Sequence, residues 1–249
     1  MRAWLSLMLL TACVSAEPTP DIDLDAELED GKGDANTQLV YLNFGGDRLH
    51  GGDCSDAPSN CSSAIAGTQD LAPFTLSTEW DRGKVVAAIT SCVAQFFDDM
   101  NVRFVTTRPS GGDYTMMMIG AIYPTQLGFA QNGQGPYGRA PVDCGNRNRR
   151  DIGFILLEDD VNPDFYFLCR STAHELGHLF GMVHTQGPNA IHNTRVDMMC
   201  ETAECANAVA GGDRWDTVNK EMSSEVEACD GRETQNTYAR LMETLGVRR

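Results

Sequence analysis

The sequence predicts an α/β fold in which a twisted, mostly parallel sheet with one antiparallel edge strand is backed by a long helix. Two observations predict it. Short apolar runs typical of strands alternate with segments of helical periodicity, and the last predicted strand is followed by a second helix. The order along the chain is strand, helix, strand, strand, loop, strand, helix, which favours a helix lying beneath a sheet.

Each strand is predicted from its own pattern. The first is a mostly apolar run that includes Val40 and Tyr41, and the second ends before Pro109. The third is rich in methionine, and its residues 116–118 are better explained as core than as a soft-metal site. The fourth is continuously apolar, as a buried strand would be. The predicted strands are residues 39–44, 102–107, 115–122 and 152–157.

Three helices are predicted from apolar residues at helical spacing. Residues 78–100 form a long amphipathic segment that Ser77 or Thr78 could cap. A second helix begins near Phe165 and carries the histidine motif described next. Residues 234–245 place their apolar side chains on one face and are expected to form the last helix.

Residues 174–184 read HELGHLFGMVH, which matches the zinc-binding pattern H-E-x-x-H-x-x-G-x-x-H. On a helix, His174 and His178 are four residues apart and project from one face, so they can share a metal ion. Glu175 lies beside them, where it can act as a base without being a ligand. Gly181 permits a tight turn that brings His184 back as a third ligand. Three protein ligands leave a fourth zinc position open, which is typical of a catalytic site.

The N-terminus predicts export. One positive charge precedes a short apolar run that is typical of a secretion signal and too short to span a bilayer. Residues 10–13 resemble the bacterial lipobox, so residues 1–12 are expected to be a lipoprotein signal peptide and Cys13 a lipidated N-terminus. The protein is then an outer-membrane or cell-surface lipoprotein, tethered by the acidic, flexible residues 13–37. The alternative is a secreted protein whose ordinary signal peptide is cut near Ala16.

Of the nine cysteines, setting aside Cys13 leaves eight, which in an exported protein predicts up to four disulfides. Two pairs are close in sequence and could form local bridges, Cys54 with Cys61 and Cys200 with Cys205. The sequence does not fix how the other four pair: Cys92, Cys144, Cys169 and Cys229.

The net charge of −16 disfavours a nucleic-acid partner and supports solubility. The membrane is expected as a partner only through the lipid anchor, and the oligomeric state is not predicted. Calcium is compatible with the many aspartates, but no EF-hand spacing or glycine-aspartate repeat supports it.

The histidine motif with a methionine downstream resembles the metzincin clan of zinc endopeptidases. The resemblance implies an α+β, zincin-like catalytic domain over residues 38–249 and a methionine-containing turn beneath the zinc, with Met199 favoured and Met198 the alternative. It also implies that an edge strand holds the substrate, and its matching residues here are Gly128, Phe129 and Ala130.

The chain also departs from the clan. Glu201 stands where some members place a tyrosine beside the zinc. Residues 141–145 are weakly similar to a cysteine switch, but the even cysteine number favours a disulfide for Cys144.

The expected activity is hydrolysis of peptide bonds in a protein or peptide substrate, with one catalytic zinc ion and Glu175 as general base. Asp197 and Glu201 are candidates for orienting the histidine rings, although a surface charge is the preferred interpretation of each. Two alternatives stay open. The domain could be a lipid-tethered binding or adhesion module with a non-catalytic zinc ion, or an enzyme that acts on another amide.

Overall fold

The computed structural model describes residues 36–128, 137–157, 163–186 and 190–248. Backbone contacts divide the chain into Met1–Lys32 and Gly33–Arg249, and everything below concerns the second unit. The predicted signal peptide, the lipidation residue Cys13 and nearly all of the predicted tether lie outside the described residues, as do Phe129 and Ala130. In the described part of the chain, no helix is long and apolar enough to cross a membrane.

The central sheet has five strands in the order β6-β1-β7-β9-β8. The first four pair in parallel, and β8 pairs antiparallel with β9 at one edge, so the predicted fold class is confirmed. Each predicted strand is found: the first is shifted by one residue toward the N-terminus, and the other three end one or two residues earlier than predicted. The edge strand β8 lies at residues that the sequence patterns did not mark. The strands are β1 (Gln38–Asn43), β6 (Val102–Val105), β7 (Thr115–Gly120), β8 (Gly138–Arg139) and β9 (Ile152–Leu156).

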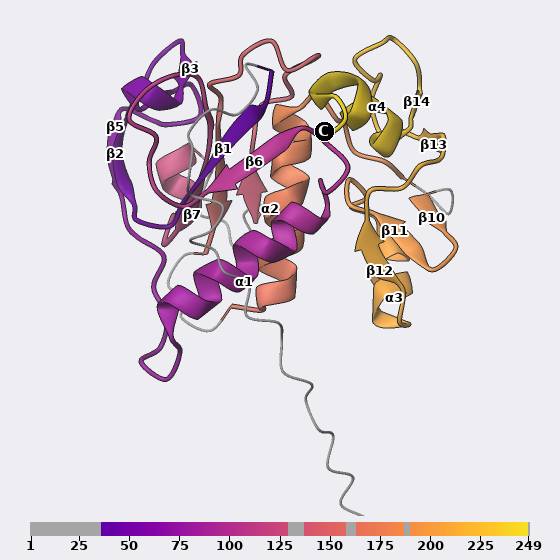
Figure 1. The fold of residues 1–249 in the computed structure, drawn as a ribbon, viewed down its shortest axis with the longest axis horizontal. Helices are drawn as coiled ribbons and strands as arrows, with labels where there is room; N and C mark the ends of the chain where they lie inside the picture. Colours follow the sequence, from indigo (N-terminus) through magenta and orange to yellow (C-terminus); the bar gives the residue numbers. More distant parts are fainter. Residues whose placement is uncertain (1–35, 129–136, 158–162, 187–189, 249) are drawn as a thin grey trace, which may run out of the picture. The chain divides into compact units, whose positions relative to one another are not determined.

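Two helices, α1 (Arg82–Gln95) and α2 (Phe165–Leu179), cover one face of this sheet and are seen side by side in Figure 1. Their apolar residues share a core with one side of β7, including Met117 and Ile119. The first helix starts later than predicted. Its cap is Asp81, whose carboxylate accepts a hydrogen bond from the Lys84 amide, so neither Ser77 nor Thr78 caps it.

A second, smaller sheet covers the other face, and the sequence patterns missed it. It has the order β3-β4-β2-β5, and Met116 and Met118 pack in the core on this side. These strands are only two to five residues long and mostly polar, so no periodicity marked them. The elements are β2 (Asp47–Gly51), β3 (Ser55–Asp56), a 3-10 turn η1 (Ala57–Ser59), β4 (Cys61–Ser62) and β5 (Thr68–Leu71).

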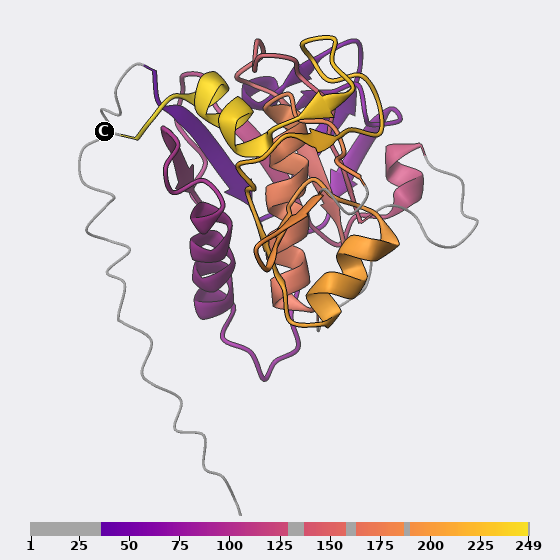
Figure 2. The same ribbon diagram turned by 90° about the vertical axis from the view of Figure 1, so that its right-hand side faces the viewer.

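The segment after α2 is built from short elements, and both ribbon views place it on the side of α2 away from β2–β5 (Figures 1 and 2). The last helix is confirmed, although the Asn236 cap makes it begin at Thr237. The elements are β10 (Ile191–His192), β11 (Arg195–Asp197), α3 (Ala203–Ala210), β12 (Arg214–Asp216), β13 (Met222–Ser223), β14 (Thr234–Gln235) and α4 (Thr237–Leu245).

All eight cysteines in the described residues form disulfides. Both local pairs are confirmed, Cys54–Cys61 and Cys200–Cys205. The long-range pairs are Cys92–Cys169, which joins α1 to α2, and Cys144–Cys229, which rules out a free thiol at the switch-like segment. Four disulfides indicate an exported protein or an oxidising compartment.

Candidate metal centre

Helix α2 holds the first two histidines in the interior. Asp164 caps the helix by accepting hydrogen bonds from the amides of Tyr166 and Phe167. From Leu168 onward every residue of the helix is buried, and His174 and His178 are only 2% and 8% exposed. The imidazoles are therefore fixed by the packing of the helix against the sheet and α1.

A glycine turn brings the third histidine back. The helix closes with the Met182 amide bonded to the Gly177 carbonyl and the Gly181 amide bonded to the His178 carbonyl, the pattern of a Schellman cap. Gly181 has φ of +88°, and a Cβ there would lie 2.9 Å from the Asp143 carbonyl oxygen. Only glycine fits this position without strain, and the reversal places His184 opposite the helix. The predicted role of Gly181 in the turn is confirmed.

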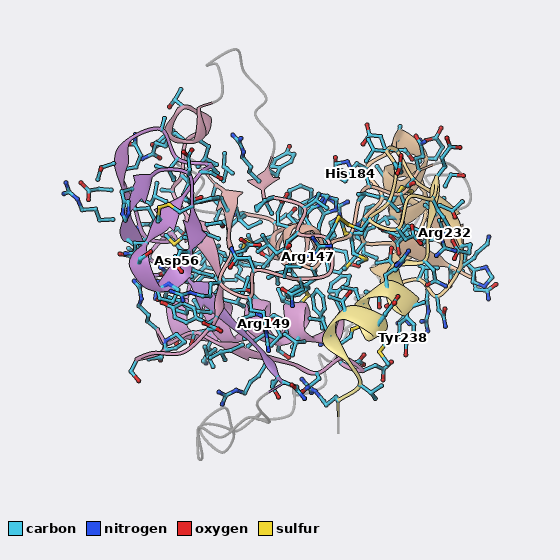
Figure 3. All side chains as sticks on the ribbon, turned by 90° about the horizontal axis from the view of Figure 1, so that it is seen from above. Asp56, Arg147, Arg149, His184, Arg232 and Tyr238 are labelled. Carbon is cyan, nitrogen blue, oxygen red and sulfur yellow. A yellow bond between two sulfur atoms is a disulfide. The ribbon has the colours of Figure 1, made fainter. Side chains whose placement is uncertain are left out.

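The three histidines converge through their Nε2 atoms. Nε2 of His184 lies 3.2 Å from Nε2 of His174 and 3.0 Å from Nε2 of His178. Zinc–nitrogen bonds of about 2.0–2.1 Å at tetrahedral angles would put ligand nitrogens roughly 3.3 Å apart. The three residues thus have the spacing of a metal site, and they can bind a metal ion. Figure 3 labels His184, which in that view lies between Asp56 of the smaller sheet and Arg232 of the C-terminal segment.

Hydrogen bonds at the opposite ring nitrogens set the tautomers. Nδ1 of His174 donates to the Met198 carbonyl at 2.8 Å, and Nδ1 of His178 donates to the Met182 carbonyl at 2.8 Å. Nδ1 of His184 lies 2.8 Å from a carboxylate oxygen of Glu225. Because these acceptors hold the Nδ1 protons, each Nε2 lone pair is free to face a metal. Burial also lowers the pKa of His178 to about 3, so its ring is neutral, as a ligand must be.

The predicted methionine turn lies under the helix. Met198 and Met199 are both fully buried, and a Cβ at Gly177 would collide with the Met199 sulfur. Met199 therefore packs its sulfur against the helix between the two histidine positions, and Met198 contacts His174 through its backbone carbonyl.

Asp197 anchors this turn and is not the surface charge that the sequence suggested. It is 0% exposed, and its carboxylate accepts hydrogen bonds from the Met199 and Val218 amides and from the Thr185 and Thr237 hydroxyls. Burial raises its pKa to about 6 despite these donors. The partners come from four separate segments, so no local sequence pattern could have shown that the group is buried.

Glu175 is buried at the side of the histidine cluster, with 7% of its surface exposed. Burial raises its pKa to about 8, and the nearby charge of Glu201 adds to the shift. Edge strand β8 packs directly against Glu175. The contact is so close at Gly138 that a Cβ there would collide with the Glu175 carboxylate. A cation bound at the histidines would lower the pKa of Glu175 and leave it as the carboxylate that a general base requires.

Glu201 points back at the histidines although half of its side chain is exposed. One carboxylate oxygen lies 3.2 Å from Nε2 of His174, and the other lies 3.5 Å from Nε2 of His184. The contact with the His174 ring is the main reason that the pKa of Glu201 falls to about 2. The sequence interpretation of Glu201 as an ordinary surface charge is therefore incomplete.

An open cleft of about 640 Å³ runs past the cluster, between β8 and the segment after the methionine turn. One wall contains Arg170, whose guanidinium lies 4.3 Å from the Trp215 ring centre and donates to the Cys200 carbonyl. The opposite wall is β8, whereas Gly128 follows the turn η2 (Pro124–Leu127) with φ of +76°. Among the described residues, β8 lines the cleft and Gly128 does not, and the other two residues of the predicted substrate strand, Phe129 and Ala130, lie outside the described residues.

The sequence therefore identified the residues of one helix and one turn, and it missed their distant partners. Glu225, Arg170 and Trp215 were not singled out, because nothing local to them marks a metal site. In comparisons with protein-family models and with curated proteins, nothing matched this chain, so its function is inferred from the geometry of the site.

Proposed function

We propose that this protein is a zinc-dependent endopeptidase, as its resemblance to the metzincins implies. One observation carries the proposal: three histidine Nε2 atoms converge at metal-ligand spacing in a cleft that also contains a buried glutamate. A glutamate at that place has a use in hydrolysis and none in a purely structural zinc site.

His174, His178 and His184 would hold the ion. A bound zinc ion would polarise the scissile carbonyl and make water a stronger acid. Glu175 would accept the proton of the attacking water as general base and then pass it to the leaving amine as general acid. An extended peptide would pair with the edge of β8 and so pass over Glu175.

A second candidate function, a binding or adhesion module with a non-catalytic zinc ion, is favoured by one observation. Glu201 approaches the cluster from the protein side, and a fourth protein ligand is typical of a structural zinc site. In either case the tether and lipid anchor at Cys13 would place the domain outside the cytoplasm.

The test is cleavage of a mixed peptide library by the purified protein and by Glu175→Gln, with the zinc content of both measured. Cleavage by the parent alone, with equal zinc in both, supports the endopeptidase. Equal zinc with no cleavage by either protein supports the binding module. A folded parent that takes up no zinc contradicts both candidates.

A further inference from the structure

Glu201 is held at the rim of the histidine cluster by an unusually well-fixed backbone. Its neighbour Cys200 is disulfide-bonded to Cys205, its amide bonds to the Asp197 carbonyl at 3.0 Å, and its carbonyl accepts from Arg170 at 2.6 Å. The side chain of Glu201 itself is half exposed. A fixed backbone with a half-exposed carboxylate would allow the carboxylate to approach the cluster and to withdraw from it.

The carboxylate lies at ligand spacing from two of the three histidines. Its oxygens are 3.2 Å and 3.5 Å from the Nε2 atoms of His174 and His184, close to the roughly 3.3 Å expected between two ligands of one tetrahedral zinc ion. These nitrogens are the ones whose lone pairs face the metal position, because the Nδ1 protons are bound to Met198 and Glu225. Glu201 is therefore directed at the metal position rather than at the outer edge of the rings.

Charge supports the same assignment. Glu201 and Glu175 line one cleft, so two carboxyl groups lie beside the metal position. The Arg170 guanidinium also lines the cleft, but it donates to the Cys200 carbonyl, and no ion pair between it and either glutamate occurs among the described residues. A divalent cation held by neutral histidines would sit between the two carboxylates and compensate both charges.

From this geometry we infer that Glu201 is a fourth, displaceable protein ligand of the metal ion. It would occupy the position that water or a substrate carbonyl needs, and would have to withdraw before either could bind. Because the metal centre is itself a proposal, the role of Glu201 rests on it, and the experiment separates the two.

The experiment compares the parent with Glu201→Gln and with the control Glu204→Gln, which removes the same charge from an exposed position three residues away. Zinc affinity is measured by competition with a chromophoric chelator. The visible absorption spectrum of the Co²⁺-substituted proteins reports the ligand set. Acetohydroxamate, a small chelating probe of the fourth position, is titrated into the Co²⁺ proteins, and circular dichroism checks that each variant is folded.

For Glu201→Gln we expect zinc affinity to fall about tenfold or more and the Co²⁺ spectrum to change, while Glu204→Gln matches the parent. If Glu201 occupies the fourth position about nine-tenths of the time, its loss should tighten acetohydroxamate binding about tenfold. Glu201→Ala is the second variant, and it should behave like the glutamine variant or more strongly, since it retains no oxygen to coordinate.

Two results overturn the assignment. If both Glu201 variants keep the zinc affinity and the Co²⁺ spectrum of the parent, the residue is not a ligand. If zinc affinity falls but acetohydroxamate binding does not tighten, the ligand is not displaceable. Failure of the proposed function looks different: a parent that binds no metal loses both proposals, whereas metal binding with the expected Glu201 effects and no peptide cleavage contradicts the endopeptidase alone.

Discussion

The contact between Glu225 and His184 offers a direct test of how the metal centre is supported. His184 is the most exposed of the three histidines, with 28% of its side chain accessible, and it is the only one whose Nδ1 binds a carboxylate. The other two rings are bound by buried backbone carbonyls that no side-chain substitution removes. Changing Glu225 therefore alters the support of one ligand and leaves the other two intact.

The size of the effect follows from the exposure of Glu225. Removing a partner of a metal-bound histidine costs about 10–100-fold in metal affinity. Glu225 is 60% exposed, so solvent and salt weaken its charge and the lower end of that range applies. We expect Glu225→Ala to weaken zinc binding about tenfold. Glu225→Gln keeps an acceptor and loses only the charge, so its effect should be smaller.

The assay is chelator competition for zinc at low and high salt, with Glu233→Gln as a control that removes an exposed charge from the adjoining segment. The difference between Glu225→Gln and the parent should shrink at high salt, because it arises from charge alone. Zinc affinity unchanged in Glu225→Ala would refute the reasoning. An equal loss in the Glu233 control would show a general charge effect rather than support of His184.

Three further predictions concern stability and are measured by denaturant unfolding. Relative to the change measured for the control Gly83→Ala, which reports the gain in helix propensity, Gly177→Ala should lower the free energy of unfolding by about 1–3 kcal/mol, because its new Cβ meets the buried sulfur of Met199. Equal changes in the two variants would contradict that packing. The pKa of Asp151 is raised by burial from 3.8 to about 6, so its stabilising contribution is present at low pH and lost as the pH rises through 6. The parent should therefore lose about 2 kcal/mol relative to Asp151→Asn between pH 4.5 and 7.5, and a constant difference would refute the shift. Replacing Cys144 and Cys229 by alanine opens a link of sequence separation 85 and should cost about 4 kcal/mol, whereas a cost below about 1 kcal/mol would contradict the chain-entropy account.

The sequence predicted those parts of the fold and the site that depend on local pattern. Strands β1, β6, β7 and β9 are short, largely apolar runs and helix α2 has helical spacing, and the histidines are grouped by that spacing and one glycine turn. Such features need only a few neighbouring residues, so they can be read without knowing the tertiary structure.

What the sequence missed depends on contacts between distant segments. The small sheet over residues 47–71 is built from strands too short for periodicity and is stabilised by packing against Met116 and Met118. Asp197 looks like any charged residue until Val218 and Thr237 are seen to bind it. Glu201 stands next to a recognisable motif, yet only the fold shows that its carboxylate turns toward the histidines.

The central claim is that the three histidines bind zinc and that Glu175 uses it for hydrolysis. The most direct measurement is the zinc content and peptide cleavage of the parent beside His178→Ala and Glu175→Gln. The account predicts one zinc ion per chain in the parent and in Glu175→Gln, loss of zinc from His178→Ala, and cleavage by the parent alone. Full zinc occupancy in His178→Ala, or undiminished cleavage by Glu175→Gln, would contradict it.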